Sequence, residues 1–237
     1  MAFPGSDRSH RFNTLRSEGC PESGHLGIAI RACFGKPAFE IMQQGLTQLG
    51  AKNKAFPEKT MIFGLFGKKN NNQAIVDRQY HALTSAARMP DFYERLNVPD
   101  TVMGRFEMLS VVMILFFRRT RASATSGQEI AQEIVDAFFE DIDYSIRELG
   151  IGDNSVPKRM KKLAGMFYGR LEAYSSAMDT SDPVALAVAL SRNVHPKAVD
   201  TVDMSGLADW MFAAEAYLSA QSEDVVATGS TTLPKVA

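Results

Sequence analysis

Residues 108–117 read MLSVVMILFF and form the most apolar segment of this 237-residue chain. The segment is about half as long as the 18–20 residues that a helix needs to cross a bilayer. A helix that is apolar on all sides is buried among other elements of a protein. We therefore predict a buried central helix that begins at Asp100 or Thr101. This helix is expected to leave the core at Arg118, Arg119 and Arg121.

Helical periods of apolar residues recur on both sides of this segment. Side chains that repeat at three- and four-residue spacing mark the buried stripe of an amphipathic helix. No stretch keeps the two-residue alternation of a strand, and no internal repeat is present. The sequence therefore predicts an all-α, single-domain bundle of about six helices within residues 73–222, followed by a flexible tail over residues 223–237. The expected helices cover residues 73–88, 100–121, 126–149, 155–178, 182–193 and 203–218.

Residues 1–60 differ from the rest of the chain, because glycine and proline are scattered through them and no period persists. We interpret them as a poorly ordered or wrongly assigned N-terminal extension, with Met61 as the natural start; a functional tail is the alternative. A short lead-in follows over residues 61–72. It either tucks onto the core or contacts a membrane, with apolar side chains inserted and lysines facing lipid phosphates. The candidate membrane-proximal residues are Ile62, Phe63, Leu65, Phe66, Lys68 and Lys69.

The composition is that of a globular protein, with 45% hydrophobic and 22% charged residues and a net charge of −1. A net charge so close to zero gives no general attraction to nucleic acid, and we expect no DNA partner. The two cysteines, Cys20 and Cys33, argue against a disulfide framework and a thiolate metal site. The four histidines lack metal-ligand spacing, and the motifs of phosphate loops, serine hydrolases and zinc proteases are absent. The sequence therefore predicts no catalytic residue, no metal and no cofactor.

Four cations, Lys158, Arg159, Lys161 and Lys162, open the helix expected from residue 155. Basic side chains at a helix start oppose the macrodipole, so local helix stability does not favour them. One interpretation is a solvated helix start that pairs with the acidic face of the preceding helix. The other is a patch for an anionic partner, such as RNA, the ribosome surface or lipid headgroups.

Gly165 and Gly169 lie four residues apart on the polar side of the same helix. Each costs about 1 kcal/mol relative to alanine in a helix interior, so a compensating role is expected. Two glycines at this spacing leave a flat strip that another helix backbone can approach closely. The strip serves either an internal helix crossing or the docking of a partner helix.

Several sequence blocks occur together in a fixed order: ARMPDFY at residues 87–93, VPDTVMGRFE at 98–107, GIGDNSVPKRMKK at 150–162 and FYGRLEAY at 167–174. In wording and order they resemble the ubiquinol–cytochrome c chaperone family, whose members are assembly factors for cytochrome b of the respiratory bc1 complex. The similarity extends from residue 73 to residue 178 and indicates a bacterial member. The resemblance implies an all-helical, non-enzymatic protein that handles newly made cytochrome b.

The resemblance also implies a location in the cytoplasm, peripheral to the inner membrane, or in the mitochondrial matrix of a eukaryote, near the ribosome that makes the client. We predict that cytochrome b binds a helical groove whose charged side chains are not needed for internal packing. The candidate partner-binding residues are Phe92, Tyr93, Arg105, Glu107, Lys158, Arg159, Lys162, Gly165, Tyr168, Gly169 and Arg170. Two alternatives stay open: a ribosome- or RNA-binding module centred on the basic run, and an enzyme that uses His81 with Arg105 and Glu107.

Overall fold

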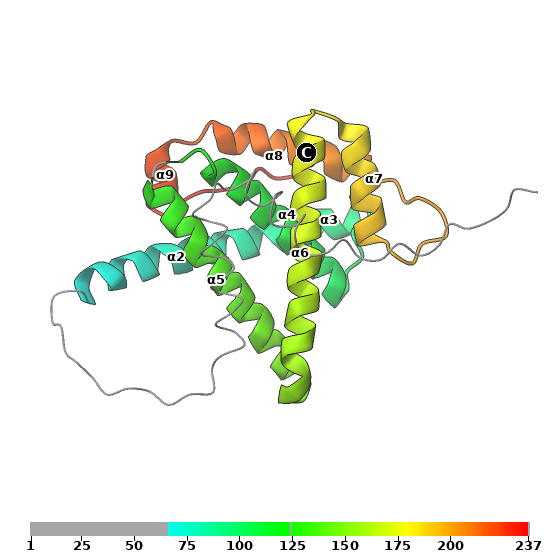
Figure 1. Cartoon of the computed structure of the whole chain (residues 1–237). Coiled ribbons are helices and arrows are strands. Elements are labelled where there is room, and N and C mark those ends of the chain that lie inside the picture. The colour runs from blue at the N-terminus through cyan, green and yellow to red at the C-terminus, as the bar shows by residue number, and fades with distance from the viewer. Residues whose placement is uncertain (1–65, 124, 237) are drawn as a thin grey trace, which may run out of the picture.

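The computed structural model describes residues 66–123 and 125–236 (Figure 1). No strand occurs among these residues, so the predicted all-α class is confirmed. Six of the helices have 12 or more residues, in agreement with the periodicity of the sequence. The elements are α2 (Phe66–Ala87), α3 (Pro90–Glu94), α4 (Val102–Thr120), α5 (Thr125–Glu148), the 3-10 turn η1 (Asp153–Ser155), α6 (Val156–Asp179), α7 (Pro183–Val194), α8 (Ser205–Ser219) and α9 (Glu223–Ala227).

The predictions for the N-terminal residues concern positions that the structure describes only in part. The expected extension over residues 1–60 lies outside the described residues, as do Ile62, Phe63 and Leu65. Helix α2 begins earlier than predicted, at residue 66 instead of residue 73. Its first turn therefore contains the remaining members of the lead-in cluster, Phe66, Lys68 and Lys69. Membrane contact by this segment stays a prediction.

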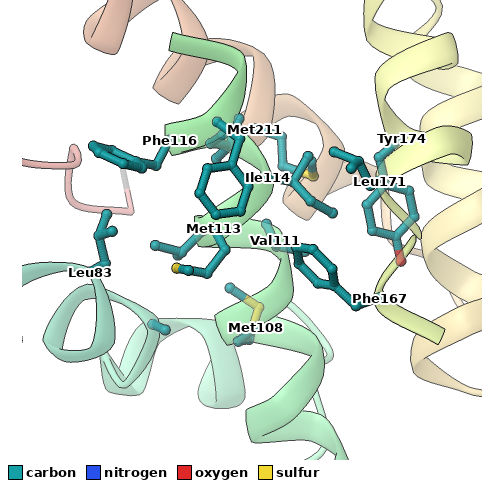
Figure 2. Packing of buried hydrophobic residues seen from close by; sticks show 14 of the residues in the cluster. Leu83, Met108, Val111, Met113, Ile114, Phe116, Phe167, Leu171, Tyr174 and Met211 are labelled. Atoms are coloured by element: carbon teal, nitrogen blue, oxygen red, sulfur yellow. The ribbon is translucent and has the colours of Figure 1, made fainter. Parts of the chain in front are cut away.

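Helix α4 is the centre of the fold and packs against α2, α5, α6, α7 and α8. All residues from Val111 to Phe117 are buried. Figure 2 shows Leu83 of α2 on one side of the helix and Phe167 of α6 on the other. Thr101 caps the helix, because its hydroxyl accepts a hydrogen bond from the Gly104 N–H at 3.0 Å. The prediction of a buried central helix is confirmed.

The arginines at the end of α4 anchor neighbouring helices instead of marking an exit from the core. Arg118 pairs with Glu215 of α8 at 2.6 Å and with Asp179 of α6 at 2.8 Å, and its side chain is only 7% exposed. Arg119 pairs with Glu223 of α9 at 2.8 Å. A buried guanidinium needs such partners, so acidic side chains from three elements cover this end of α4. The expectation that Arg118 and Arg119 mark an exit from the core is wrong, whereas Arg121 is exposed, as expected.

The C-terminal segment packs onto α2 and α8, although the sequence predicted a flexible tail for residues 223–237. The side-chain amide of buried Gln79 donates to the Thr231 carbonyl oxygen at 3.1 Å, and its oxygen accepts from the Thr231 N–H at 2.9 Å. The indole N–H of Trp210 donates to the Pro234 carbonyl oxygen at 3.3 Å. Beyond α9 the segment has no helical period. It is held by hydrogen bonds between its backbone and side chains of distant helices, and such bonds cannot be predicted from the sequence of the segment itself.

Of three other predicted caps, one forms its hydrogen bond and two do not. Asp182 caps α7, because its carboxylate accepts a hydrogen bond from the Ala185 N–H at 2.9 Å. Ser155 immediately precedes α6, as predicted, but makes no side-chain cap hydrogen bond. The expected capping role of Ser126 is wrong, since α5 already begins at Thr125.

Candidate partner-binding surface

The structure distributes the predicted partner-binding residues over three places. One group lies buried where α4 meets α6 and where α3 meets α8. A second lines a hollow formed by α3 and the start of α4. The third is the solvent-exposed face of α6. Only the last two are accessible to another protein.

Glu107 of α4 and Arg170 of α6 form a buried ion pair. They are 2% and 6% exposed, and both carboxylate oxygens accept hydrogen bonds from the guanidinium. Arg170 also donates to the Met166 carbonyl oxygen at 2.8 Å, and its guanidinium lies 5.9 Å from the centre of the Phe106 ring. Burial raises the pKa of the Glu107 carboxyl, and pairing with Arg170 opposes that shift. The prediction that packing does not need these charges is wrong, because each compensates the other inside the fold.

Phe92 and Tyr168 are core residues, although both were expected to contact a partner. Phe92 is fully buried, and its ring meets the edge of Trp210 at a centroid distance of 4.7 Å. Tyr168 is 4% exposed, and its ring lies 6.1 Å from that of Phe139. Burial raises the pKa of the Tyr168 hydroxyl, which has no hydrogen-bond partner within the described chain. These two side chains support the surface from beneath and do not form it.

The sequence blocks at residues 87–93 and 98–107 together line a polar hollow of about 370 Å³. Arg105 pairs with Asp100 at 2.8 Å, with 63% of the arginine side chain exposed. The hydroxyl of Tyr93 donates to the Ala87 carbonyl oxygen at 2.8 Å. The hydrogen bond from Arg105 lowers the pKa of the Asp100 carboxyl. Tyr93 and Arg105 are thus accessible, as predicted. The lining residues are Arg88, Pro90, Tyr93, Glu94, Asp100 and Arg105.

Helix α6 presents an open strip of glycines to solvent. Gly165 and Gly169 are exposed, and a Cβ atom added at either position would meet nothing within 4 Å. The alternative of an internal helix crossing is therefore wrong for the described part of the chain. The strip continues into a groove of about 520 Å³ between α6 and α7, lined mostly by small side chains. The groove residues are Gly169, Glu172, Ala173, Ser176, Ala177, Thr180, Ala185, Ala189 and Arg192.

The basic start of α6 is exposed and carries no ion pair with any residue that the structure describes. The acidic residues near it are already engaged, because Arg147 pairs with Asp143 at 2.7 Å and with Asp153 at 2.6 Å. The cations at residues 158–162 therefore do not pair with the acidic face of α5, which was one of their two interpretations. Their charge faces solvent.

His81 does not join Arg105 and Glu107 in one site. It is exposed on α2, and the hollow that holds Arg105 includes neither of the other two. Within residues 66–123 and 125–236, no group of three or more His, Cys, Asp or Glu side chains could hold a metal ion. No helix in the same ranges is both long and apolar enough to cross a membrane. These three residues therefore do not form the common site that the enzyme hypothesis requires.

Replacing Gly165 or Gly169 by alanine is expected to stabilise the protein by about 0.5–1 kcal/mol each, because alanine is the better helix former and its methyl group would meet open space. Thermal unfolding followed by circular dichroism would show midpoints raised by about 2–4 °C. Gly104→Ala is the matched contrast, since its Cβ would lie 1.8 Å from the Pro99 carbonyl oxygen. That substitution is expected to destabilise. A lowered midpoint for Gly169→Ala would instead point to an internal packing role.

Comparison with known proteins finds one matching family and relatives that are named as assembly factors. The family described as Ubiquinol-cytochrome C chaperone matches residues 94–233. The chain is 24% identical over 123 residues to ubiquinol-cytochrome-c reductase complex assembly factor 1 of Xenopus laevis, which covers 52% of this chain and 61% of the relative. It is 25% identical over 154 residues to the Mus musculus protein of that name, which covers 64% of this chain and 52% of the relative. The chain thus matches between half and two thirds of the length of these curated relatives.

A solved structure extends the match to the fold. The crystal structure of the Cbp3 homolog from Brucella abortus is 44% identical to this chain, with a TM-score of 0.67, and the match covers 74% of this chain and 98% of that one. The family match includes the buried ion pair, the exposed face of α6 and part of the hollow. The resemblance carried by the four sequence blocks is therefore confirmed: the chain belongs to the ubiquinol–cytochrome c chaperone family.

Proposed function

We propose that this protein is an assembly chaperone of the respiratory bc1 complex that binds newly made cytochrome b, its client, through the exposed face of α6. Family membership supports the assembly role, as do relatives named assembly factors of the ubiquinol–cytochrome c reductase complex. The observation that carries the binding mode is the glycine strip, which is open to solvent. The two glycines weaken an isolated helix and make no internal contact in the described chain. A partner that packs against them would explain their presence.

The chemistry of the strip suits an apolar client helix. Helices of membrane proteins approach closely where small residues leave the backbone uncovered. Gly165 and Gly169 provide such a surface, and the groove beside α7 extends it with alanine and serine side chains. Before its neighbours are in place, a membrane-spanning helix of the client exposes apolar surface that this strip would cover. Lys158, Arg159 and Lys162 stand at the start of the same helix, as polar contacts for the end of the client segment.

Tyr93 and Arg105 are proposed as a second, polar contact in the hollow of α3 and α4. Arg105 and Asp100 form an ion pair in which both side chains are exposed to solvent. Such pairs contribute about 0–1 kcal/mol to stability, so the fold does not depend on this one. The arginine is therefore free to exchange its carboxylate for a group on the client.

Filling the strip with a bulky side chain tests the proposal. A Gly169→Phe variant, expressed from a tagged gene in a strain that lacks the chaperone, is expected to fold but to lose co-purification of cytochrome b. Ala213→Phe is the matched control, because Ala213 is exposed on α8 away from the strip. It is expected to recover cytochrome b and bc1 activity. Both variants should keep the helical circular dichroism signal of the parent.

Three outcomes would contradict parts of this proposal. Normal levels of cytochrome b in the deletion strain would remove the chaperone role. Full recovery of the client by Gly169→Phe would remove α6 as its binding face. Capture of ribosomes with no cytochrome b, abolished at high salt, would favour the ribosome-binding alternative.

A further inference from the structure

We infer that the tip of the α5–α6 hairpin, residues 144–162, docks onto the headgroup layer of an anionic membrane. The inference concerns the far end of α6 from the groove and a ligand that is lipid. It shares Lys158, Arg159 and Lys162 with the client contact proposed above, but its test contains no client, so the two proposals can fail separately. Three properties of the hairpin tip carry it: a cluster of cations without ion pairs among the described residues, exposed apolar side chains, and a position clear of the rest of the fold.

The charge of the hairpin tip is available to a ligand. Elsewhere in the fold, Arg118 and Arg119 are each held by carboxylates at 2.6–2.8 Å, and within the tip Arg147 is held by Asp153 at 2.6 Å. By contrast, the four cations at residues 158–162 are exposed and have no ion pair among the described residues. Clusters of lysine and arginine at a surface are attracted to acidic phospholipids, by a factor of roughly five in affinity for each cation.

An apolar element accompanies this charge. Leu149, at the end of α5, is 64% exposed, and Tyr144 one turn earlier is 61% exposed. Gly150 follows with φ 73°, a left-handed conformation that ends the helix and turns the chain. A leucine beside lysines suits the boundary between headgroups and acyl chains. Single-stranded RNA would instead require several stacking aromatic side chains, so the observations favour lipid.

The shape of the molecule lets the hairpin tip reach a flat surface. Figure 1 shows the joined ends of α5 and α6 extending beyond α4, α7 and α8. The acidic face of α5 lies farther back: Glu129 is roughly 28 Å and Glu140 roughly 12 Å along the helix from Glu148. Both distances exceed the screening length of about 8–10 Å at physiological salt. A negative membrane therefore attracts the hairpin tip first and repels the opposite end of α5.

The test uses the full chain and vesicles of phosphatidylcholine mixed with phosphatidylglycerol, compared with vesicles of phosphatidylcholine alone. A Lys158→Glu, Lys162→Glu variant is expected to bind the anionic vesicles at least about thirty-fold more weakly than the parent, because two cations are lost and two repelled charges are added. The matched control is Lys197→Glu, Lys235→Glu, which makes the same charge change at two other exposed lysines. That control is expected to bind like the parent, within a factor of two or so.

A second pair of variants separates lipid from other anions. Leu149→Gln is expected to weaken vesicle binding roughly ten-fold, whereas Val199→Gln, at a fully exposed position in another loop, should leave it unchanged. Equal loss in the two lysine pairs, or binding that ignores Leu149, would overturn the inference. The same holds if the parent binds a structured RNA but not the anionic vesicles. Unchanged circular dichroism spectra and unfolding midpoints would show that all four variants are folded.

Discussion

An Arg170→Met variant is expected to lose about 3–5 kcal/mol of unfolding free energy. The substitution keeps much of the side-chain volume but leaves the carboxylate of Glu107, which is 2% exposed, without the guanidinium that binds both its oxygens. A buried charge without a partner is among the costliest defects in a folded protein. Urea denaturation followed by circular dichroism would measure the loss. Arg105→Met is the control, and its solvent-exposed pair with Asp100 predicts a clearly smaller change.

The same variant is expected to gain stability relative to the parent as the pH falls. In the parent, burial raises the pKa of Glu107 and Arg170 opposes the rise; without the arginine, burial acts unopposed. A carboxyl with a raised folded pKa stabilises the fold below its unfolded pKa, and this stabilisation is lost as the pH rises through the folded pKa. The deficit of Arg170→Met should therefore shrink between about pH 8 and about pH 5.

A double variant provides the check on this explanation. Glu107→Leu with Arg170→Met removes both charges, so most of the lost stability should return and the added pH dependence should disappear. A single-variant deficit that is small and equal at both pH values would show that Glu107 and Arg170 do not form a buried charged pair. If the double variant stays as unstable as the single one, packing at this position outweighs the charges.

Replacing Phe167 with alanine is expected to cost about 3–5 kcal/mol. The side chain is 1% exposed and lies at the centre of an aromatic cluster, 5.1 Å from the Phe138 ring and 6.3 Å from that of Phe117. These rings come from α5 and α4, so the cavity would open where three helices meet. Thermal unfolding of Phe212→Ala, at a half-buried position on α8, should show a clearly smaller loss. Equal losses at the two positions would contradict the central role of Phe167.

Most of the helices could be predicted from the periodicity of apolar residues in the sequence. The segment at residues 108–117 predicted the buried centre correctly, because an uninterrupted apolar run can only be covered from all sides. The exposed face of α6 was also predictable, since each position on an amphipathic helix follows from its spacing. Lys158, Lys162, Gly165 and Gly169 are all exposed, as that spacing requires.

Pairings between distant segments could not be predicted in the same way. Glu107 and Arg170 are 63 positions apart, and each taken alone is a charged residue that is usually found in solvent. Gln79 and Thr231 are bonded through a backbone segment that has no pattern of its own. Local sequence shows which face of a helix is polar, but not whether a second helix brings an opposite charge to that face. For this reason Glu107 and Arg170 proved to be internal, as did Phe92 and Tyr168, so four of the candidate binding residues are buried.

The contact between Gln79 and Thr231 joins positions that are 152 residues apart. Because translation proceeds from the N-terminus, α2 leaves the ribosome long before the backbone that will close over it. Until then the amide of Gln79, buried in the finished fold, has no protein partner at that site. We therefore expect the contact between α2 and the C-terminal segment to form late, after α4, α6 and α8 have been synthesised. A chain that ends before Thr231 would lack the backbone groups that bind Gln79, so its α2 should be more open to proteases than in the full chain.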